Sequence, residues 1–241
     1  MMDLLNEGVY DKGIFKAVFM AGGPGSGKSF MAQNIFGIPP KATTSVGGLK
    51  VVNSDKQFMY LLRKFGFDPT QLAHYPDELF SQLSDPVGIG SGSGLRDFAQ
   101  AIKTAESQTY MDGKLGMIID STGSNFKKVR KQKEMLEKQG YDTYMVYVST
   151  ELKTALQRNK ERAEKGDREL PANIVTKSWK ATRKNLGGLK ALFGSNFGLV
   201  NNDKFLDAKA ARHAFANLTK NYANKWIGSP IKNPIGKQWV K

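Results

Sequence analysis

One eight-residue segment constrains this chain more than any other. Residues 22–29 read Gly-Gly-Pro-Gly-Ser-Gly-Lys-Ser and match G-x-x-x-x-G-K-[ST], the P-loop motif. An apolar run of strand length, residues 15–21, precedes the segment, and residues 29–36 after it can begin a helix. Strand, glycine loop and helix in this order form the local structure in which the motif binds phosphate. The segment therefore predicts a nucleotide-binding α/β fold, and a glycine-rich turn without a ligand is the alternative.

The residue types of the segment explain its chemistry. Glycines let successive backbone N–H groups turn inward toward phosphate oxygens, and the N-terminus of the following helix adds partial positive charge. We expect Lys28 to reach the β and γ phosphates of ATP and the Ser29 hydroxyl to coordinate Mg²⁺. The residues expected to bind the nucleotide here are Gly22, Gly23, Pro24, Gly25, Ser26, Gly27, Lys28, Ser29 and Phe30.

Composition narrows the class of protein. The chain has 241 residues, of which 40% are hydrophobic, which suits one domain with a sizeable core and an appendage. No apolar run reaches the roughly 18 residues of a membrane span, and residues 1–13 lack the pattern of a signal peptide. We therefore expect a cytoplasmic protein. Cysteine is absent, which excludes disulfides, thiolate zinc sites and a cysteine nucleophile, and His74 and His213 form no ligand cluster.

The charge of the chain favours an anionic partner. The net charge is +14 and the sequence pI about 9.8, which points toward nucleic acid or phosphorylated substrates, with a solvated basic surface as the alternative. Half of the excess lies in residues 204–241, which hold eight Lys or Arg residues and one acid. We divide the chain into a catalytic domain, residues 1–206, and a basic C-terminal extension, residues 207–241. The extension either wraps the domain or contacts nucleic acid, and the sequence leaves both open.

Two acidic residues follow predicted strands. Residues 49–53 form a short strand, after which Ser54 and Gln57 give the spacing of a capping box. Asp55 is therefore a favourable charge in a first helical turn, a catalytic base, or both, because a carboxylate just beyond a parallel strand lies where α/β sheets bind ligands. Asp120 ends the next strand, as the acid of a Walker B strand does.

The second half of the chain predicts three more helices, two more strands and a lid. The predicted helices span residues 126–139, 151–165 and 171–192, and the predicted strands span residues 141–149 and 198–203. Another helix is predicted earlier in the chain, over residues 95–111. The glycine-rich stretch 87–94 is a substrate flap or a flexible connection.

Arg158 and Arg162 are four residues apart and project from one helix face. We interpret them as lid arginines that neutralise charge on a transferring phosphoryl group, with surface charges as the alternative.

These ordered features resemble the P-loop kinase group that includes phage polynucleotide kinase and the zeta-toxin kinases. The resemblance covers about residues 15–203 and rests on GGPGSGKS at 22–29, VVNSD at 51–55, IIDSTG at 118–123 and RNKERAEKGDRELP at 158–171. It implies a parallel five-stranded sheet sandwiched by helices, with a helical lid and the basic extension.

The resemblance also implies roles for individual residues. Asp55 accepts the proton of the acceptor hydroxyl, and Asp120 organises Mg²⁺ or the acceptor, with Thr122 nearby. Arg158 and Arg162 close over the triphosphate, with Arg168 as a weaker candidate. Asn202 lies where such kinases pass the adenine after their last strand.

One position departs from the polynucleotide kinases. Their arginine three residues beyond the base grips the acceptor phosphate, and Phe58 stands there in this chain; Lys56, Arg63 or Arg96 are the candidate substitutes. The phosphatase signature D-x-D-x-T of the bifunctional enzymes is absent, so we expect kinase activity alone.

The combined prediction is an ATP- and Mg²⁺-dependent kinase that phosphorylates a hydroxyl of a nucleic acid, at a 5′ end or on a modified base. A small acceptor such as a nucleotide sugar, as in zeta toxins, is the alternative. A GTPase is disfavoured because N-K-x-D and T-K-x-D are absent, and a mechanical ATPase because Ser121 follows Asp120. A nucleic-acid-binding module that uses nucleotide only for regulation remains a further alternative.

Overall fold

The computed structural model describes residues 11–39, 42–84, 94–204 and 215–241, and it is built on one parallel sheet. The spatial order of the strands is β2-β3-β1-β4-β5, and every neighbouring pair is parallel. The strands are β1 (Lys16–Ala21), β2 (Lys50–Val52), β3 (Met117–Asp120), β4 (Asp142–Ser149) and β5 (Phe197–Asn201). The prediction of an α/β fold with five parallel strands is confirmed.

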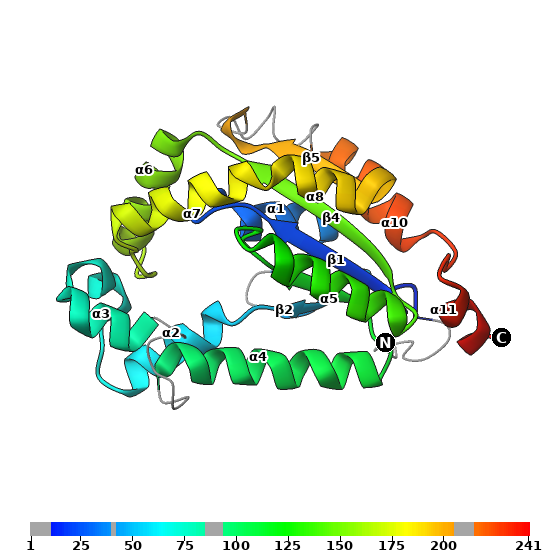
Figure 1. The fold of residues 1–241 in the computed structure, drawn as a ribbon, viewed down its shortest axis with the longest axis horizontal. Helices are drawn as coiled ribbons and strands as arrows, with labels where there is room; N and C mark the ends of the chain where they lie inside the picture. The colour runs from blue at the N-terminus through cyan, green and yellow to red at the C-terminus, as the bar shows by residue number, and fades with distance from the viewer. Residues whose placement is uncertain (1–10, 40–41, 85–93, 205–214) are drawn as a thin grey trace.

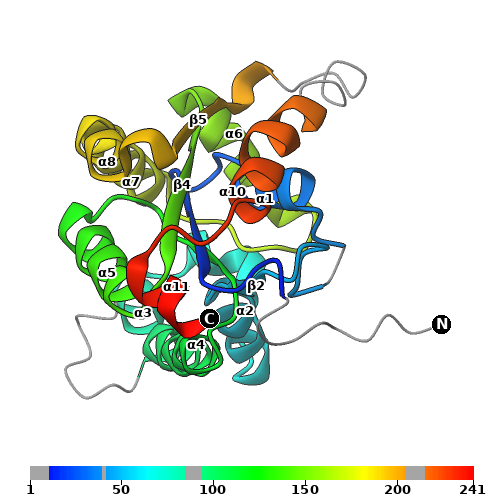
Figure 2. The same ribbon diagram turned by 90° about the vertical axis from the view of Figure 1, so that its right-hand side faces the viewer.

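Helices cover both faces of this sheet. One face carries α1 (Lys28–Phe36), the π-helical η4 (Thr219–Asn224) and α10 (Lys225–Ile227), while the other carries α5 (Phe126–Lys138), α7 (Ala172–Lys184) and α8 (Leu186–Phe193) (Figures 1 and 2). The remaining helical elements are α2 (Asp55–Lys64), η1 (Pro69–His74), α3 (Asp77–Ser84), α4 (Leu95–Asp112), α6 (Leu152–Glu164), η2 (Gly194–Asn196), η3 (Asn202–Lys204) and α11 (Pro234–Trp239).

The central strand shows why the sheet must be covered on both sides. Every residue of β1 is buried, and its side chains alternate between two apolar clusters. Val18 and Met20 pack with α1 and the C-terminal helices, whereas Ala17 and Phe19 pack toward α5 and α8. A parallel strand that is apolar on both faces needs a layer on each, which the alternating strands and helices of the sequence supply.

A separate small core lies beside the sheet. Phe58 and Leu62 of α2 pack against Leu72 of η1 and against Leu95 and Ala99 of α4, and all five are buried. This core holds α2, α3 and α4 together as a unit at the carboxyl end of β2 (Figure 1). The unit forms one wall of the pocket described below.

The described part of the C-terminal extension packs on the domain. Trp226 is buried and stacks on Tyr144 of β4 with ring centroids 5.0 Å apart, and Trp239 meets Phe15 edge to face at 5.5 Å. Phe15 and residue Gly140, which contacts α11, precede β1 and β4, so α11 lies at the amino ends of these strands. In Figure 1, α11 is at the opposite end of the molecule from α2, α3 and α6. Of the two roles left open for the extension, packing is therefore the one that its described residues display.

One predicted helix is wrong in its extent. The segment expected as a single helix over 171–192 is divided at Asn185 into α7 and α8. The Asn185 side chain donates hydrogen bonds to the carbonyl oxygens of Gly123 and Ser124, at 3.0 and 2.8 Å, and so ties this junction to the loop after β3. Residues 87–93 of the glycine-rich stretch lie outside the described residues, and Gly94 is the N-cap of α4.

Candidate active site

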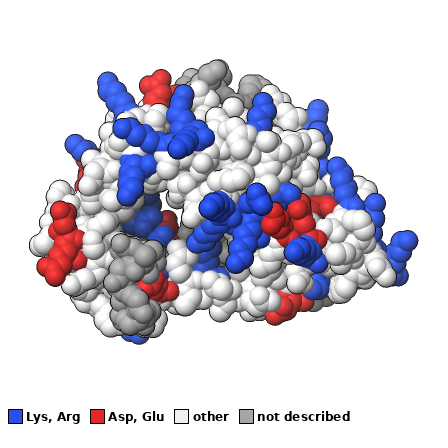
Figure 3. Space-filling view, in the orientation of Figure 1, with Lys and Arg blue, Asp and Glu red and all other residues white. Residues whose placement is uncertain are grey.

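A pocket of about 620 Å³ opens at the carboxyl ends of the strands. Parallel α/β sheets bind ligands at this edge, where the loops after several strands converge. The loop after β1, the start of α2, the inner face of α4, the loop from β3 into α5, and the end of α6 all contribute lining residues. Lys and Arg side chains gather around the hollow in Figure 3.

The loop after β1 turns back through conformations that favour glycine. Gly25 and Gly27 have φ angles of +74° and +84°, and Gly27 is the N-cap of α1. A Cβ on Gly25 would overlap the carbonyl group of Ala155, and one on Gly27 would overlap the side-chain amide of Asn202. The loop is thus fixed by close contact with α6 and with the residue that follows β5.

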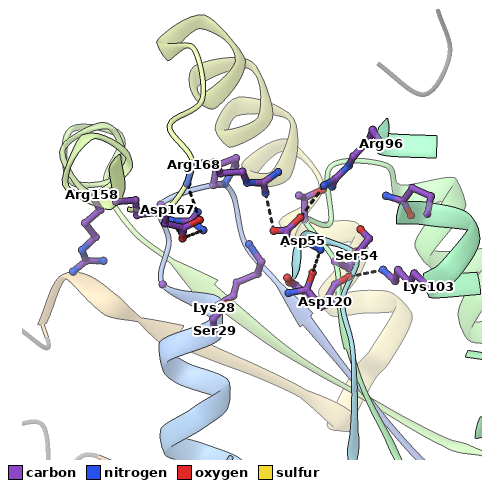
Figure 4. Close-up of a pocket in the computed structure, with 18 of the residues that line it drawn as sticks. Lys28, Ser29, Ser54, Asp55, Arg96, Lys103, Asp120, Arg158, Asp167 and Arg168 are labelled. Atoms are coloured by element: carbon purple, nitrogen blue, oxygen red, sulfur yellow. Dashed lines mark hydrogen bonds and ion pairs between the residues drawn. The ribbon is translucent and has the colours of Figure 1, made fainter. Parts of the chain in front are cut away.

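The P-loop lysine lies at the floor of this pocket. Lys28 begins α1 (Figure 4). Its Nζ donates to the carbonyl oxygen of Gly22 at 2.9 Å and to that of Gly23 at 3.4 Å. Ser29 lines the pocket beside it.

The residues predicted to bind nucleotide or metal or to take part in catalysis divide into two groups. Those that line the pocket are Pro24, Gly25, Gly27, Lys28, Ser29, Asp55, Asp120, Arg158 and Arg162. Those that do not line it are Gly22, Gly23, Ser26, Phe30 and Asn202. Phe30 is 46% exposed and packs edge to face on Phe215, so its side chain lies outside the pocket.

Asp55 lies between two arginines. It begins α2, and Arg96 Nη1 of α4 lies 2.9 Å from its Oδ1, while Arg168 Nη2 lies 2.7 Å from its Oδ2 (Figure 4). The capping box expected from Ser54 and Gln57 is wrong, because the Ser54 side chain makes no capping hydrogen bond and Gln57 binds Glu106. 

The N–H of Asp55 instead donates to Asn53 Oδ1 at 2.7 Å. The short Asx turn is therefore what supports the backbone of Asp55.

The charges around Asp55 determine its protonation. Burial by itself would raise the pKa of Asp55, but the guanidinium groups of Arg168 and Arg96 outweigh burial, and Lys28 adds to them. The pKa of Asp55 is therefore held well below its usual value. The group is a carboxylate at any physiological pH.

Phe58 has a part in this arrangement. Its buried ring lies beneath both guanidinium groups, with Cζ of Arg96 5.0 Å and Cζ of Arg168 5.9 Å from the ring centroid. Of the candidate substitutes for a missing arginine at this position, Arg96 is the one that lines the pocket. Lys56 and Arg63 bind backbone carbonyl groups elsewhere.

Asp120 ends β3 one strand away from Asp55. Its Oδ1 is buried and has no hydrogen-bond partner among the described residues, while its backbone carbonyl accepts a hydrogen bond from Lys103 Nζ at 3.0 Å. Burial raises the pKa of Asp120 and the nearby charge of Lys28 opposes the rise. A buried carboxylate oxygen without a donor is an available ligand for a cation.

The lid segment, residues 158–170, closes the pocket from the other side. Arg158 Nη2 donates to the carbonyl oxygen of Asn202 at 3.2 Å, whereas its Nη1 is buried without a partner among the described residues. The amide of Asn202 donates to the carbonyl oxygen of Ser26 at 2.6 Å and so clamps the P-loop from outside. Arg162 pairs with Asp167 at 2.5 Å, and both line the pocket.

Sequence reasoning missed several lining residues. Lys103 and Gln100 share a face of α4 with Arg96, and Lys128 extends from α5. Residues 96, 100 and 103 have the spacing of one helix face, so Gln100 and Lys103 could have been predicted as pocket residues from the position of Arg96. Arg168, the weaker of the lid candidates in the sequence, is the lid arginine that contacts Asp55.

The comparisons with known proteins agree with this architecture. A family model described as an AAA domain matches residues 18–188. Among solved structures, a chain of the PezAT chromosomal toxin–antitoxin system of Streptococcus pneumoniae superposes with a TM-score of 0.51 at 17% identity, covering 98% of this chain and 88% of that one.

A second structure is a chain of the Pnkp1/Rnl/Hen1 RNA repair complex. Its TM-score is 0.50 at 16% identity, and the match covers 73% of the present chain and 46% of that chain, less than half its length. A search of curated sequences found no significant match. At these identities, the two structures establish a shared fold.

Proposed function

The chain belongs to the AAA_33 family of AAA domains, and we propose that it is a kinase that transfers the γ-phosphoryl group of ATP to a hydroxyl of a nucleic acid. The observation that carries the proposal is that Lys28 and Asp55 line one pocket from different walls and are close enough for Lys28 to lower the pKa of Asp55. A phosphate-binding lysine opposite an ionised carboxylate is what transfer between a nucleotide and a hydroxyl requires.

ATP would bind at the P-loop end of the pocket. Lys28 offers its ammonium group to the β and γ phosphates, and backbone N–H groups of the loop offer further donors. The unpartnered Nη1 of Arg158 is a buried donor that a phosphate oxygen would satisfy. Arg162 lines the same end and would add charge once its contact with Asp167 is loosened.

The donors present fit Mg²⁺. Ser29 and Asp120 would hold it, and the unpartnered Oδ1 of Asp120 supports this assignment. No group of three or more acidic, His or Cys side chains able to hold a metal occurs among the described residues. One or two protein carboxylates are enough for Mg²⁺, because phosphate oxygens and water complete its octahedral coordination. When bound, it neutralises charge on the phosphates.

Asp55 would orient the acceptor. Both carboxylate oxygens hold an arginine, yet an ionised carboxylate offers about four acceptor sites, so an acceptor hydroxyl can still donate to it. As the hydroxyl oxygen bonds to the γ phosphorus and the bond to the bridging oxygen breaks, ADP leaves and the hydroxyl proton passes to Asp55. Phosphoryl transfer asks for alignment more than for a strong base, which suits a carboxylate of low pKa.

Basic helices beside the pocket support a nucleic-acid acceptor. α5 has five basic residues before its first acid, Glu134, and α7 has four basic residues and no acid. Both helices lie on the same face of the sheet (Figures 1 and 2). Lys177, Lys180 and Lys184 of α7 are exposed. Such a surface attracts a phosphate backbone. These helices, rather than the C-terminal extension with its α11 at the opposite end, would therefore meet the acceptor.

The test is transfer of label from γ-labelled ATP in the presence of Mg²⁺. The acceptors are 5′-hydroxyl DNA and RNA, duplexes with hydroxymethylated bases, and sugar nucleotides. We expect labelled oligonucleotide with the wild-type protein and none with Lys28→Ala. Label on sugar nucleotides alone would favour the small-molecule alternative, and ATP binding without transfer to any acceptor would favour a regulatory binding module.

A further inference from the structure

Two lysines in the pocket have no part in the proposed transfer. Lys103 extends from α4 and Lys128 from α5, and both line the same pocket as Asp55 and Asp120. Lys103 points toward the end of β3, where its Nζ donates to the carbonyl oxygen of Asp120 at 3.0 Å (Figure 4). The two ammonium groups thus approach one space from two walls.

Neither lysine has an ion pair among the described residues. Three arginines of the pocket do, since Arg96 and Arg168 hold Asp55 and Arg162 holds Asp167. Lys103 is half-buried and Lys128 is exposed. Two like charges on the walls of one pocket repel each other, and an anion bound between them would remove that repulsion.

The charge of the whole pocket also favours an anionic ligand. Its lining has eight Lys and Arg side chains and four Asp and Glu side chains. Lys28 and Arg158 would serve the triphosphate of ATP. The excess around Lys103 and Lys128 is therefore available for a second anionic ligand.

Neutral hydrogen-bond donors lie beside both lysines. Gln100 of α4 and Gln132 of α5 line the pocket on the same two helices, each about one helical turn from one of the lysines. Two cations and two amides match the several oxygens of a phosphate better than the two oxygens of a carboxylate.

We propose that Lys103 and Lys128 form a phosphate-binding subsite for the acceptor. The substrate class is then a hydroxyl compound that carries a phosphate near the reacting hydroxyl. For a nucleic acid, this phosphate is the first phosphodiester after the 5′-terminal nucleoside. The assignment rests on the proposed function, because it identifies the second ligand of the same pocket as the acceptor.

A binding experiment tests the subsite without turnover. The protein is first saturated with Mg²⁺ and the β,γ-imido analogue of ATP, then titrated calorimetrically with thymidine 3′-phosphate or with thymidine. We expect the phosphorylated probe to bind roughly tenfold more tightly or better, as charge-assisted hydrogen bonds to one phosphate provide. Lys128→Gln and Lys103→Met should remove this preference. Lys127→Gln, a neighbouring exposed lysine of α5 outside the pocket lining, should retain it.

The outcomes separate the subsite from general surface charge and from the nucleotide site. Equal weakening by Lys127→Gln and Lys128→Gln, or no weakening by Lys128→Gln, would overturn the proposal. So would a loss of affinity for the ATP analogue in Lys128→Gln, since the lysine would then belong to the nucleotide. Lysine-dependent binding of the probe by a protein that transfers no label to any acceptor would support the subsite while contradicting the kinase function.

Discussion

Nη2 of Arg168 lies 2.7 Å from Oδ2 of Asp55, although 113 residues separate them in the chain. This contact joins the lid segment to the first turn of α2. Arg63 of α2 makes a second connection by donating to the carbonyl oxygen of Gly166 at 3.0 Å. Asp55, the carboxylate proposed to orient the acceptor hydroxyl, is thus held from both sides, by α4 through Arg96 and by the lid segment through Arg168.

Replacing Arg168 by Ala should raise the pKa of Asp55. The charge of Arg168 is the largest single effect that lowers this pKa, so its loss moves the pKa back toward the ordinary value. The acidic limb of the profile of kcat/KM against pH should move upward, and kcat/KM should fall about tenfold to a hundredfold as alignment is lost. Arg63→Ala is the control, because it removes the other lid contact without touching Asp55. Identical pH profiles for Arg168→Ala and wild type would contradict the role of this pair.

Replacing Asp55 by Asn should remove turnover and spare ATP binding. The amide keeps the size of the side chain but cannot take the hydroxyl proton, so kcat should fall roughly a hundredfold or more. Affinity for ATP, measured by titration, should stay within about threefold of wild type because the nucleotide is held by other residues. A fully active Asp55→Asn protein would show that this carboxylate neither accepts the proton nor orients the acceptor.

Asp55 should also make the free energy of unfolding depend on pH within a defined range. Because the folded-state pKa of Asp55 is lowered, its ion pairs stabilise the fold fully above the unfolded-state pKa of about 3.9 and lose that effect as pH falls toward the folded-state pKa. The difference in unfolding free energy between wild type and Asp55→Asn should therefore be constant from about pH 5 to 8 and shrink below about pH 4. Urea unfolding at several pH values measures it. A difference that grows on acidification would contradict the direction of the pKa shift.

Local patterns explain what could be predicted from the sequence. The P-loop is contiguous, and its glycines specify their own backbone conformations, so residues 22–29 needed no tertiary information. Asp55 follows one strand and Asp120 ends the next, and the parallel topology brings the ends of those strands to one edge. Alternation of strands and helices then determined the fold class.

Long-range contacts explain what could not be predicted. The pairing of Arg168 with Asp55 depends on how the lid segment returns over α2, and nothing near either residue in the sequence specifies it. Trp226 and Tyr144, which pack together, are also far apart in the sequence. Composition alone therefore left open whether the C-terminal extension packs on the domain or contacts nucleic acid. The break at Asn185 arises from its hydrogen bonds to Gly123 and Ser124, whereas the local sequence allows a continuous helix.

The buried pair of Lys16 and Asp142 should be a major source of stability for the C-terminal helices. Lys16 Nζ lies 2.9 Å from Asp142 Oδ2, and the side chains are 1% and 6% exposed. The Asp142 carboxylate also accepts hydrogen bonds from the backbone N–H groups of Lys232 and Asn233, which precede α11. It is therefore the anchor of the chain segment that leads to the C-terminus.

Asp142→Ala would leave a buried ammonium group and two amides without their acceptor. We expect it to lower the free energy of unfolding by about 3–5 kcal/mol, the range for breaking one side of a buried pair. Lys16→Met is the matched variant, since the carboxylate then keeps the two amides and the loss should be smaller. Urea unfolding measures both, and affinity for ATP at 15 °C should match wild type because the pair lies at the amino ends of β1 and β4, opposite the pocket. A loss below about 1 kcal/mol for Asp142→Ala would mean that water replaces the carboxylate and that the extension is held by its apolar contacts, Trp226 above all.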